Sequence, residues 1–192
     1  MPDRAPGPGE LHDLAAEAVA AVSEAARRGT QLGAAEFTAL LVRAGRLEGP
    51  VLLSTAWSTG TITDATLAVH VGRVWSMAEY PDAALDRPAW NELFTAAGFT
   101  ADGRTVPRPA QPVTLWRGSV PERRADWSWT IRRSVAKGYA TGTGARRPRT
   151  GRLYRTVAPP TALLAYNSNR GEDEYVLDTT GLTITEMPLT GA

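Results

Sequence analysis

The sequence predicts an α+β protein, in which a helical N-terminal region precedes a curved antiparallel sheet or split barrel. Apolar residues recur at helical spacing over roughly the first hundred residues, and short runs of strand-like alternation follow. Between these regions, residues 101–112 hold three prolines and a glycine, which is typical of a linker. We therefore expect a disordered tail (1–9), a helical region (10–100), a linker (101–112) and a β-rich core (113–192).

The helical region is predicted from apolar spacing and from the residues that end helices. The first span has apolar residues on one face and ends before Gly29, and the second ends before Gly45. The third is capped by Asp64, and the fourth begins at Pro88 and stops at Gly98. The four expected helices cover 10–28, 34–43, 64–77 and 88–97. Residues 51–60 fit either a strand or a short helix.

The β-rich core is predicted from six short runs rich in β-branched, aromatic and other apolar residues. A single helix, at about 132–140, follows the second run directly. The expected strands cover 113–118, 126–130, 152–158, 162–166, 174–179 and 182–187. Many short strands with one helix favour an antiparallel sheet rather than a parallel one.

Composition excludes several kinds of chemistry. The chain has 192 residues, no cysteine, two histidines and a net charge of +1. Disulfides, thiolate metal sites and a cysteine nucleophile are therefore impossible, and a zinc site or a Ser-His-Asp triad is hard to assemble. We expect no metal, and the charge balance gives no reason to expect a nucleic-acid binder. No apolar run reaches the ~18 residues that span a bilayer, and no signal peptide is evident, so we expect a cytoplasmic protein without membrane contact.

Three short motifs stand out in the core. Arg117-Gly118 ends the first predicted strand, Ser128 and Thr130 flank Trp129 on the second, and Glu172-Asp173-Glu174 leads into a late strand. Taken one at a time, these are an exposed arginine before a turn, one face of a half-buried strand, and acids in a solvated loop. Their order and their strand or helix context make them informative together.

The segments "LWRG" (115–118), "WSWTIRRSVAKGYA" (127–140) and "EDEYVLDTTGL" (172–182) together resemble the arginine–serine–glutamate class of mono-ADP-ribosyltransferases. The resemblance covers about residues 112–190 and implies an ADP-ribosyltransferase-like split antiparallel β-sandwich. Trp129 departs from the family, which has a small Thr there. Strand alternation places Trp129 on the face opposite Ser128 and Thr130.

The resemblance implies an enzyme that takes NAD as substrate and releases nicotinamide. Arg117 would bind the phosphate and ribose oxygens, and Gly118 would let the backbone approach the nicotinamide carboxamide. Glu174 would bind the ribose 2′-hydroxyl and stabilise the oxocarbenium-like transition state, with Ser128 orienting it. The implied catalytic residues are Glu174, Glu172, Ser128 and Arg117. The implied NAD-binding residues are Arg117, Gly118, Ser128, Thr130 and Tyr139, although Tyr139 also fits a core position.

The acceptor is expected to depend on Glu172. Glu172 lies two residues before Glu174 on the same predicted strand, so alternation puts both on one face, while Asp173 points away and is expendable. In the resembling enzymes a first glutamate favours guanidinium acceptors, so protein arginine is the leading acceptor, ahead of nucleic acid. Arginines in the loop 141–151 could contact pyrophosphate or nucleic acid, or could be solvated. They are Arg146, Arg147 and Arg149.

Other functions remain open on the sequence. Water could be the acceptor, which would make the chain an NAD glycohydrolase. The same fold could instead be a catalytically inactive binding or interaction module. A sugar- or nucleotide-processing hydrolase could use Glu172 and Asp178 as its carboxylate pair. An intracellular toxin and a bacterial or phage effector are biological settings that fit the chain.

Overall fold

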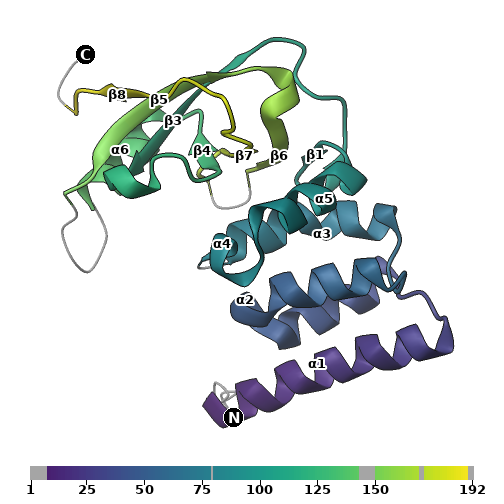
Figure 1. The fold of residues 1–192 in the computed structure, drawn as a ribbon. Coiled ribbons are helices and arrows are strands. Elements are labelled where there is room, and N and C mark those ends of the chain that lie inside the picture. Colours follow the sequence, from purple (N-terminus) through teal and green to yellow (C-terminus); the bar gives the residue numbers. More distant parts are fainter. Residues whose placement is uncertain (1–7, 79, 143–149, 169–170, 190–192) are drawn as a thin grey trace. The chain divides into compact units, whose positions relative to one another are not determined.

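The computed structural model describes residues 8–78, 80–142, 150–168 and 171–189. The chain separates into two compact units, Met1–Gly98 and Phe99–Ala192. In the described residues there are six α-helices and one eight-stranded sheet (Figure 1), so the predicted α+β class is confirmed. The division between the units comes just before the segment predicted to be a linker.

In the described part of the first unit, all regular secondary structure is helical. Neighbouring helices pack α1 on α2, α2 on α3, and α3 on α5. The predicted spans are found with small shifts, and helix α1 already begins at Pro8, inside the segment expected to be a disordered tail. Residues 51–58, left open between strand and helix, are helical. The helices are α1 (Pro8–Arg28), α2 (Ala34–Ser58), α3 (Asp64–Met77), α4 (Pro81–Ala84) and α5 (Arg87–Ala97).

Helix α2 is broken at Gly45, where the sequence predicts its end. Gly45 has φ 67° and ψ −167°, a conformation that favours glycine, and helical geometry resumes after it. At the start of α3 the capping residue is Thr63, whose hydroxyl accepts a hydrogen bond from the Thr66 amide. Asp64, predicted to be the cap, instead accepts a hydrogen bond from the Trp57 indole at 2.8 Å.

The core of the first unit is aromatic. Trp75 meets Trp90 edge-on, and Phe94 stacks on Trp90. His70 is buried with its ring against Phe37, and its Nε2 lies 3.2 Å from the carbonyl oxygen of Ala34. Burial lowers the pKa of His70.

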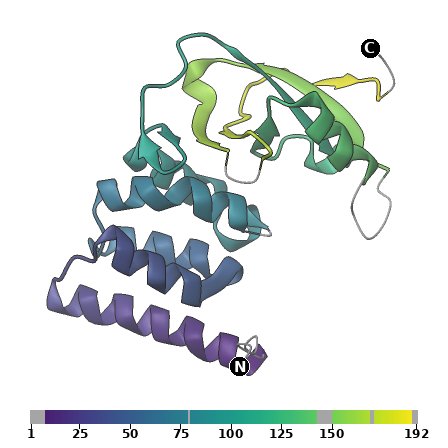
Figure 2. The same ribbon diagram turned by 180° about the vertical axis from the view of Figure 1, so that it is seen from behind.

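The second unit is built around the sheet, which Figure 2 shows from behind. The strand order is β2-β1-β6-β7-β4-β3-β5-β8. All neighbouring strands pair antiparallel except β1 and β6, which are parallel. The strands are β1 (Thr100–Ala101), β2 (Arg104–Thr105), β3 (Val113–Ser119), β4 (Ser128–Thr130), β5 (Arg152–Ala158), β6 (Leu163–Asn167), β7 (Glu174–Leu177) and β8 (Thr185–Met187). Helix α6 (Arg133–Thr141) follows β4 directly, as predicted, and short 3-10 turns lie at Pro121–Arg123 and Pro160–Ala162.

The first part of the predicted linker belongs to the sheet. Strands β1 and β2 form a hairpin whose turn residues, Asp102 and Gly103, have φ 49° and 77°. Two consecutive positive φ angles suit a tight hairpin turn, and an Asp-Gly pair adopts them readily. The composition of 101–112 indicated a break in regular structure, but the Asp-Gly turn signal within it marked a hairpin.

The two faces of the sheet have different partners. One face carries an apolar cluster of buried side chains, and Trp129 is among them at 2% exposure. The other members are Phe99, Leu115, Tyr154, Ala158, Leu163 and Leu177. Helix α6 packs on β3, β4 and β5. The predicted placement of Trp129 on the face opposite its two neighbours is thus confirmed, and on that face Trp129 belongs to the core.

Candidate active site

Strand register brings together three polar residues from separate motifs. Glu174, the first residue of β7, lies opposite Thr130 of β4 on one side and opposite Asn167 of β6 on the other. Residues directly opposite each other in neighbouring strands share a face. Trp129 and Tyr175, the adjacent pair, face the apolar cluster, so these three residues face away from it.

The same register shows that this is the face covered by α6. Thr130 lies opposite Trp116 of β3, and Gly118, two residues further along β3, contacts α6. A Cβ atom at Gly118 would lie 1.8 Å from the carbonyl oxygen of Ala136 in α6. The cluster of Thr130, Glu174 and Asn167 is therefore on the α6 side of the sheet.

Glu174 is a buried carboxylate with a specific partner. Its exposure is 8%, and its Oε2 accepts a hydrogen bond of 3.2 Å from the Asn167 amide nitrogen, which is equally buried. A carboxylate in this setting is costly unless hydrogen bonds satisfy it. Its burial at the first residue of β7 contradicts the idea of a solvated loop.

Thr130 joins the start of α6 to the segment before β7. Its hydroxyl donates a hydrogen bond of 2.5 Å to the carbonyl oxygen of Glu172 and accepts one of 3.0 Å from the Arg132 amide. Thr130 is 6% exposed. Thr130 lies opposite Glu174 in the β4–β7 pair and also binds the backbone of Glu172, so it holds that backbone close to Glu174.

Glu172 does not lie on the strand, which corrects the prediction from alternation. Strand β7 begins only at Glu174, and Asp173 has φ 47°, so the two-residue period of a strand does not extend back to Glu172. The side chain of Glu172 instead contacts α6, because its Oε1 accepts a hydrogen bond of 2.5 Å from the Tyr139 hydroxyl. Tyr139 is 45% exposed rather than part of the core.

Asp173, predicted to be expendable, is an anchor. Its Oδ1 accepts a hydrogen bond of 2.8 Å from the Tyr166 hydroxyl, and its Oδ2 lies 3.8 Å from Nη1 of Arg132. The pKa of Tyr166 is raised to about 12, mainly by the hydrogen bond to Asp173 and to a lesser extent by burial. The Arg132 guanidinium also donates to the carbonyl oxygen of Gly171 at 2.6 Å. The left-handed backbone of Asp173 is thus fixed from both sides.

Arg117 is not brought together with Glu174. It lies opposite Tyr154, a member of the apolar cluster, and is therefore on the other face of the sheet. Its guanidinium donates to the carbonyl oxygens of Arg123 and Ser128 and to Oδ2 of Asp126, at 2.9, 2.6 and 3.0 Å. These contacts hold the β3–β4 connection. Strand alternation could have predicted this position, because Leu115 is an expected core residue and Arg117, two residues later, lies on the same face.

Gly118 and Ser128 also have contacts that the motifs did not predict. The close approach that Gly118 permits is that of the α6 backbone. Ser128 is half-buried and lies opposite Val176, two residues beyond Glu174 on β7. In the described parts of the chain, the hydrogen bond expected from Ser128 to Glu174 comes from Asn167 instead. The register between β6 and β7 places Asn167 opposite Glu174, and no motif in the sequence predicted this pairing.

Two further predictions concern residues away from this cluster. Arg146, Arg147 and Arg149 lie outside the described residues. Asp178, the alternative carboxylate, accepts a hydrogen bond of 3.0 Å from the Thr180 amide, a turn contact. Over the described ranges, no group of three or more His, Asp or Glu side chains could hold a metal ion. Nor is any helix in those ranges long and apolar enough to cross a bilayer.

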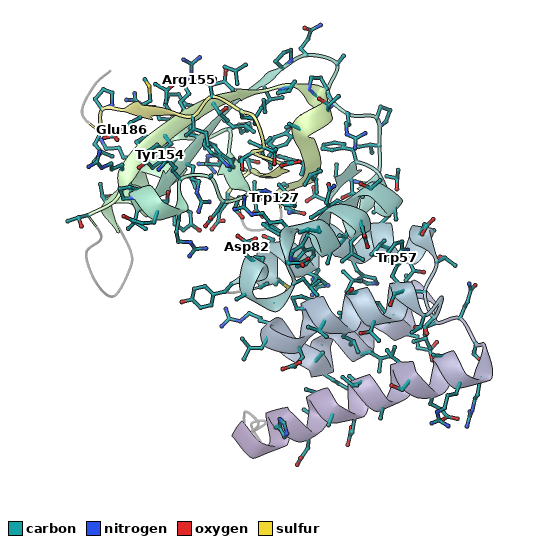
Figure 3. The ribbon with its side chains drawn as sticks, in the orientation of Figure 1. Trp57, Asp82, Trp127, Tyr154, Arg155 and Glu186 are labelled. Atoms are coloured by element: carbon teal, nitrogen blue, oxygen red, sulfur yellow. The ribbon has the colours of Figure 1, made fainter. Side chains whose placement is uncertain are left out.

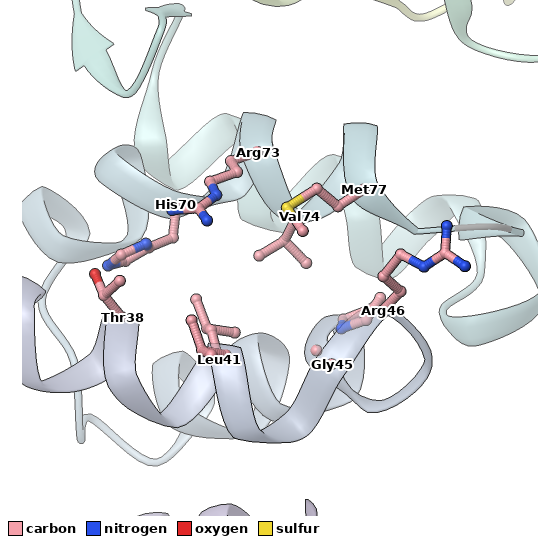
Figure 4. A pocket seen from close by; sticks show the side chains of 11 residues that line it. Thr38, Leu41, Gly45, Arg46, His70, Arg73, Val74 and Met77 are labelled. Carbon is pink, nitrogen blue, oxygen red and sulfur yellow. The ribbon is translucent and has the colours of Figure 1, made fainter. Parts of the chain in front are cut away.

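A separate pocket of about 160 Å³ lies in the helical unit, between α2 and α3 at the Gly45 break (Figure 4). Its walls are mainly apolar and include Leu41, Val74 and Met77, with His70 and Arg73 at one end. Its lining comes from residues scattered over two helices, so no motif indicated it. It has no part in the Glu174 cluster.

Comparison with models of protein families, with curated proteins and with solved structures found no match to this chain. Function is therefore inferred from the motifs and from the geometry described above.

Proposed function

We propose that residues 99–192 form an NAD-dependent mono-ADP-ribosyltransferase with an ADP-ribosyltransferase-like split β-sandwich. The enzyme transfers ADP-ribose from NAD to an acceptor, with protein arginine as the leading candidate, and releases nicotinamide. One observation carries the proposal: Glu174 is buried on the α6 side of the sheet, opposite Thr130, with Glu172 fixed beside it. The order of the motifs along β3, β4, α6 and β7 supports it.

The chemistry needs an anion at the ribose. The bond between C1′ and the nicotinamide nitrogen breaks, its electron pair stays with nicotinamide, and neutral nicotinamide leaves. Glu174 stabilises the positive charge that develops on the ribose and accepts a hydrogen bond from the 2′-hydroxyl. The acceptor nitrogen then forms its bond to C1′ and loses a proton, which Glu172 accepts. Tyr139, bonded to Glu172, holds that carboxylate in place.

The structure modifies the roles of the motif residues within this proposal. Arg117 supports the site by fixing the β3–β4 connection, and Gly118 does so by letting α6 approach. Trp129 packs in the apolar cluster, so its bulk is directed away from Glu174.

The test is nicotinamide release from NAD by purified protein. We expect Glu174→Gln to lower kcat by about 10²–10³-fold, the usual effect of removing one electrostatic stabiliser. Glu186→Gln is the matched control, because Glu186 lies on β8 beside Tyr154 and Arg155 of β5 and pairs with Arg152 at the surface (Figure 3). It should leave the rate unchanged. Full activity of the Glu174 variant would refute the mechanism.

We also propose a cytoplasmic location and a role as an effector or toxin, so the acceptor should be present in a cell lysate. Incubating such a lysate with the enzyme and labelled NAD identifies it. Transfer of label to protein, stable to nuclease, supports a protein acceptor over a nucleic acid. Glu172→Gln should then retain nicotinamide release but lose transfer to arginine. Nicotinamide release without any transfer would identify a glycohydrolase, and NAD binding without release would identify an inactive binding module.

A further inference from the structure

Asn167 is the neighbour through which Glu174 contacts β6. The two residues lie directly opposite each other in the antiparallel pair β6–β7, and each is 8% exposed. The Asn167 amide donates to Oε2 of Glu174 at 3.2 Å. A hydrogen bond to an ionised carboxylate in a buried place is stronger than one between neutral groups at the surface.

Thr130, the neighbour on the other side, cannot serve as a donor to the same carboxylate. A threonine hydroxyl has one hydrogen, and that of Thr130 is donated to the carbonyl oxygen of Glu172. In the part of the chain that the structure describes, the hydrogen bond from Asn167 is the one that the Glu174 side chain receives. The orientation of this carboxylate therefore depends on the amide.

Asn167 is itself held firmly from both sides along the chain. The next residue, Ser168, donates from its amide and its hydroxyl to the carboxylate of Asp102, at 2.7 and 2.8 Å. The preceding residue, Tyr166, accepts a hydrogen bond at its carbonyl oxygen from the Asp102 amide and donates from its hydroxyl to Asp173. The hairpin turn at Asp102 thus fixes the end of β6 where Asn167 lies.

We infer that Asn167 is a positioning residue that fixes the plane of the Glu174 carboxylate, so that Oε1 is directed to the ribose of NAD. The inference rests on the proposed function. An amide suits this task better than a cationic side chain, because Lys or Arg would neutralise the charge that stabilises the developing oxocarbenium ion. The amide sets the orientation and leaves the negative charge of Glu174 intact.

The first test compares Asn167→Ala with wild type in steady-state nicotinamide release. Residues that orient a catalytic group typically contribute 10–100-fold, so kcat should fall by about that factor while KM for NAD stays within about twofold. The matched control is Asn91→Ala, a change at an exposed position of α5. A kcat for Asn167→Ala within about twofold of wild type overturns the inference.

The second test uses Asn167→Asp, which has nearly the same shape but places a second carboxylate against Glu174. Two adjacent carboxylates cannot both be ionised cheaply, so they share a proton as the pH falls. The shared proton restores a hydrogen bond, and the activity of this variant relative to wild type should rise towards acidic pH. A pH profile parallel to that of wild type contradicts the inference, whereas a purely structural role predicts no such change in profile.

A third readout separates this inference from the proposed function. The side-chain amide resonances of Asn167 in an NMR spectrum should shift in Glu174→Gln and stay unchanged in Glu186→Gln. If wild type releases no nicotinamide, the proposed function fails, and the catalytic part of the Asn167 inference fails with it. If wild type is active but the Asn167 resonances and kinetics are insensitive, only the Asn167 inference fails.

Discussion

Replacing Gly118 by alanine should push α6 away from the sheet. The new Cβ would lie 1.8 Å from the carbonyl oxygen of Ala136 and 2.5 Å from the amide nitrogen of Ala140, and both atoms belong to the helix backbone. Real Cβ atoms essentially never approach closer than 3.0 Å, so going from 1.8 to 3.0 Å requires α6 to retreat by at least about 1.2 Å. A backbone obstacle cannot rotate away as a flexible side chain would.

The expected cost is about 3 kcal/mol of unfolding free energy, at the upper end of the usual range for overpacking. Gly138→Ala is the matched control, because Gly138 lies within α6 and a Cβ there would meet nothing within 4 Å. Alanine inside a helix is more favourable than glycine by about 0.5–1 kcal/mol, so this variant should gain stability. The same glycine-to-alanine change should thus lower the stability at Gly118 and raise it at Gly138.

Urea unfolding, followed by amide signals of β3 and α6, measures both variants. The Gly118 variant should also weaken the hydrogen bond between Tyr139 and Glu172, since Tyr139 moves with the helix. If Gly118→Ala is as stable as wild type, the contact between β3 and α6 is not as close as described. The assignment of Gly118 to helix packing would then be refuted, and its predicted role at the ligand would regain its basis.

Three further outcomes are expected. The pKa of Tyr166 is raised to about 12 from 10.0, so between these pH values the folded protein keeps a proton that the unfolded chain loses. The free energy of unfolding should therefore fall as pH rises from 10 to 12. Tyr166→Phe should make this fall smaller in urea titrations. Arg117→Lys and Asp126→Asn disturb one network, so a double-mutant cycle should give a coupling of about 1–3 kcal/mol, and additive effects would contradict it. Thr130→Ala should cost about 1–3 kcal/mol in unfolding free energy, and Thr130→Ser, which keeps the hydroxyl, clearly less; equal losses would exclude the hydroxyl as the cause.

Local patterns predicted the elements well, because they depend on nearby residues. Apolar spacing and terminal glycines located the helices, and the positive φ of Gly98 confirms its role as a helix end. Alternation over the three residues of β4 correctly placed Trp129 in the core. Where two signals competed, as for the Asp-Gly turn inside a proline-rich stretch, composition alone misled.

The site was harder to predict because it depends on register between distant strands. Asn167 faces Glu174 through the pairing of β6 with β7, and nothing near Asn167 in the sequence encodes that pairing. Alternation was also wrongly applied to Glu172, because the backbone of Asp173 is left-handed and the strand begins only after it, at Glu174. Arg117 was grouped with Glu174 by motif order, although its spacing from Leu115 already placed it on the opposite face.

The segment from Gly171 to Asp173 is held at each residue by groups from β4, α6, β6 and Arg132, which lies between β4 and α6. Loops that recognise partners usually lose conformational entropy when the partner arrives, and that loss weakens binding. Here the loss has been incurred during folding. An acceptor that docks against Glu172 would therefore meet a surface already ordered by these hydrogen bonds, and calorimetry of the association should show a small entropic penalty from this segment.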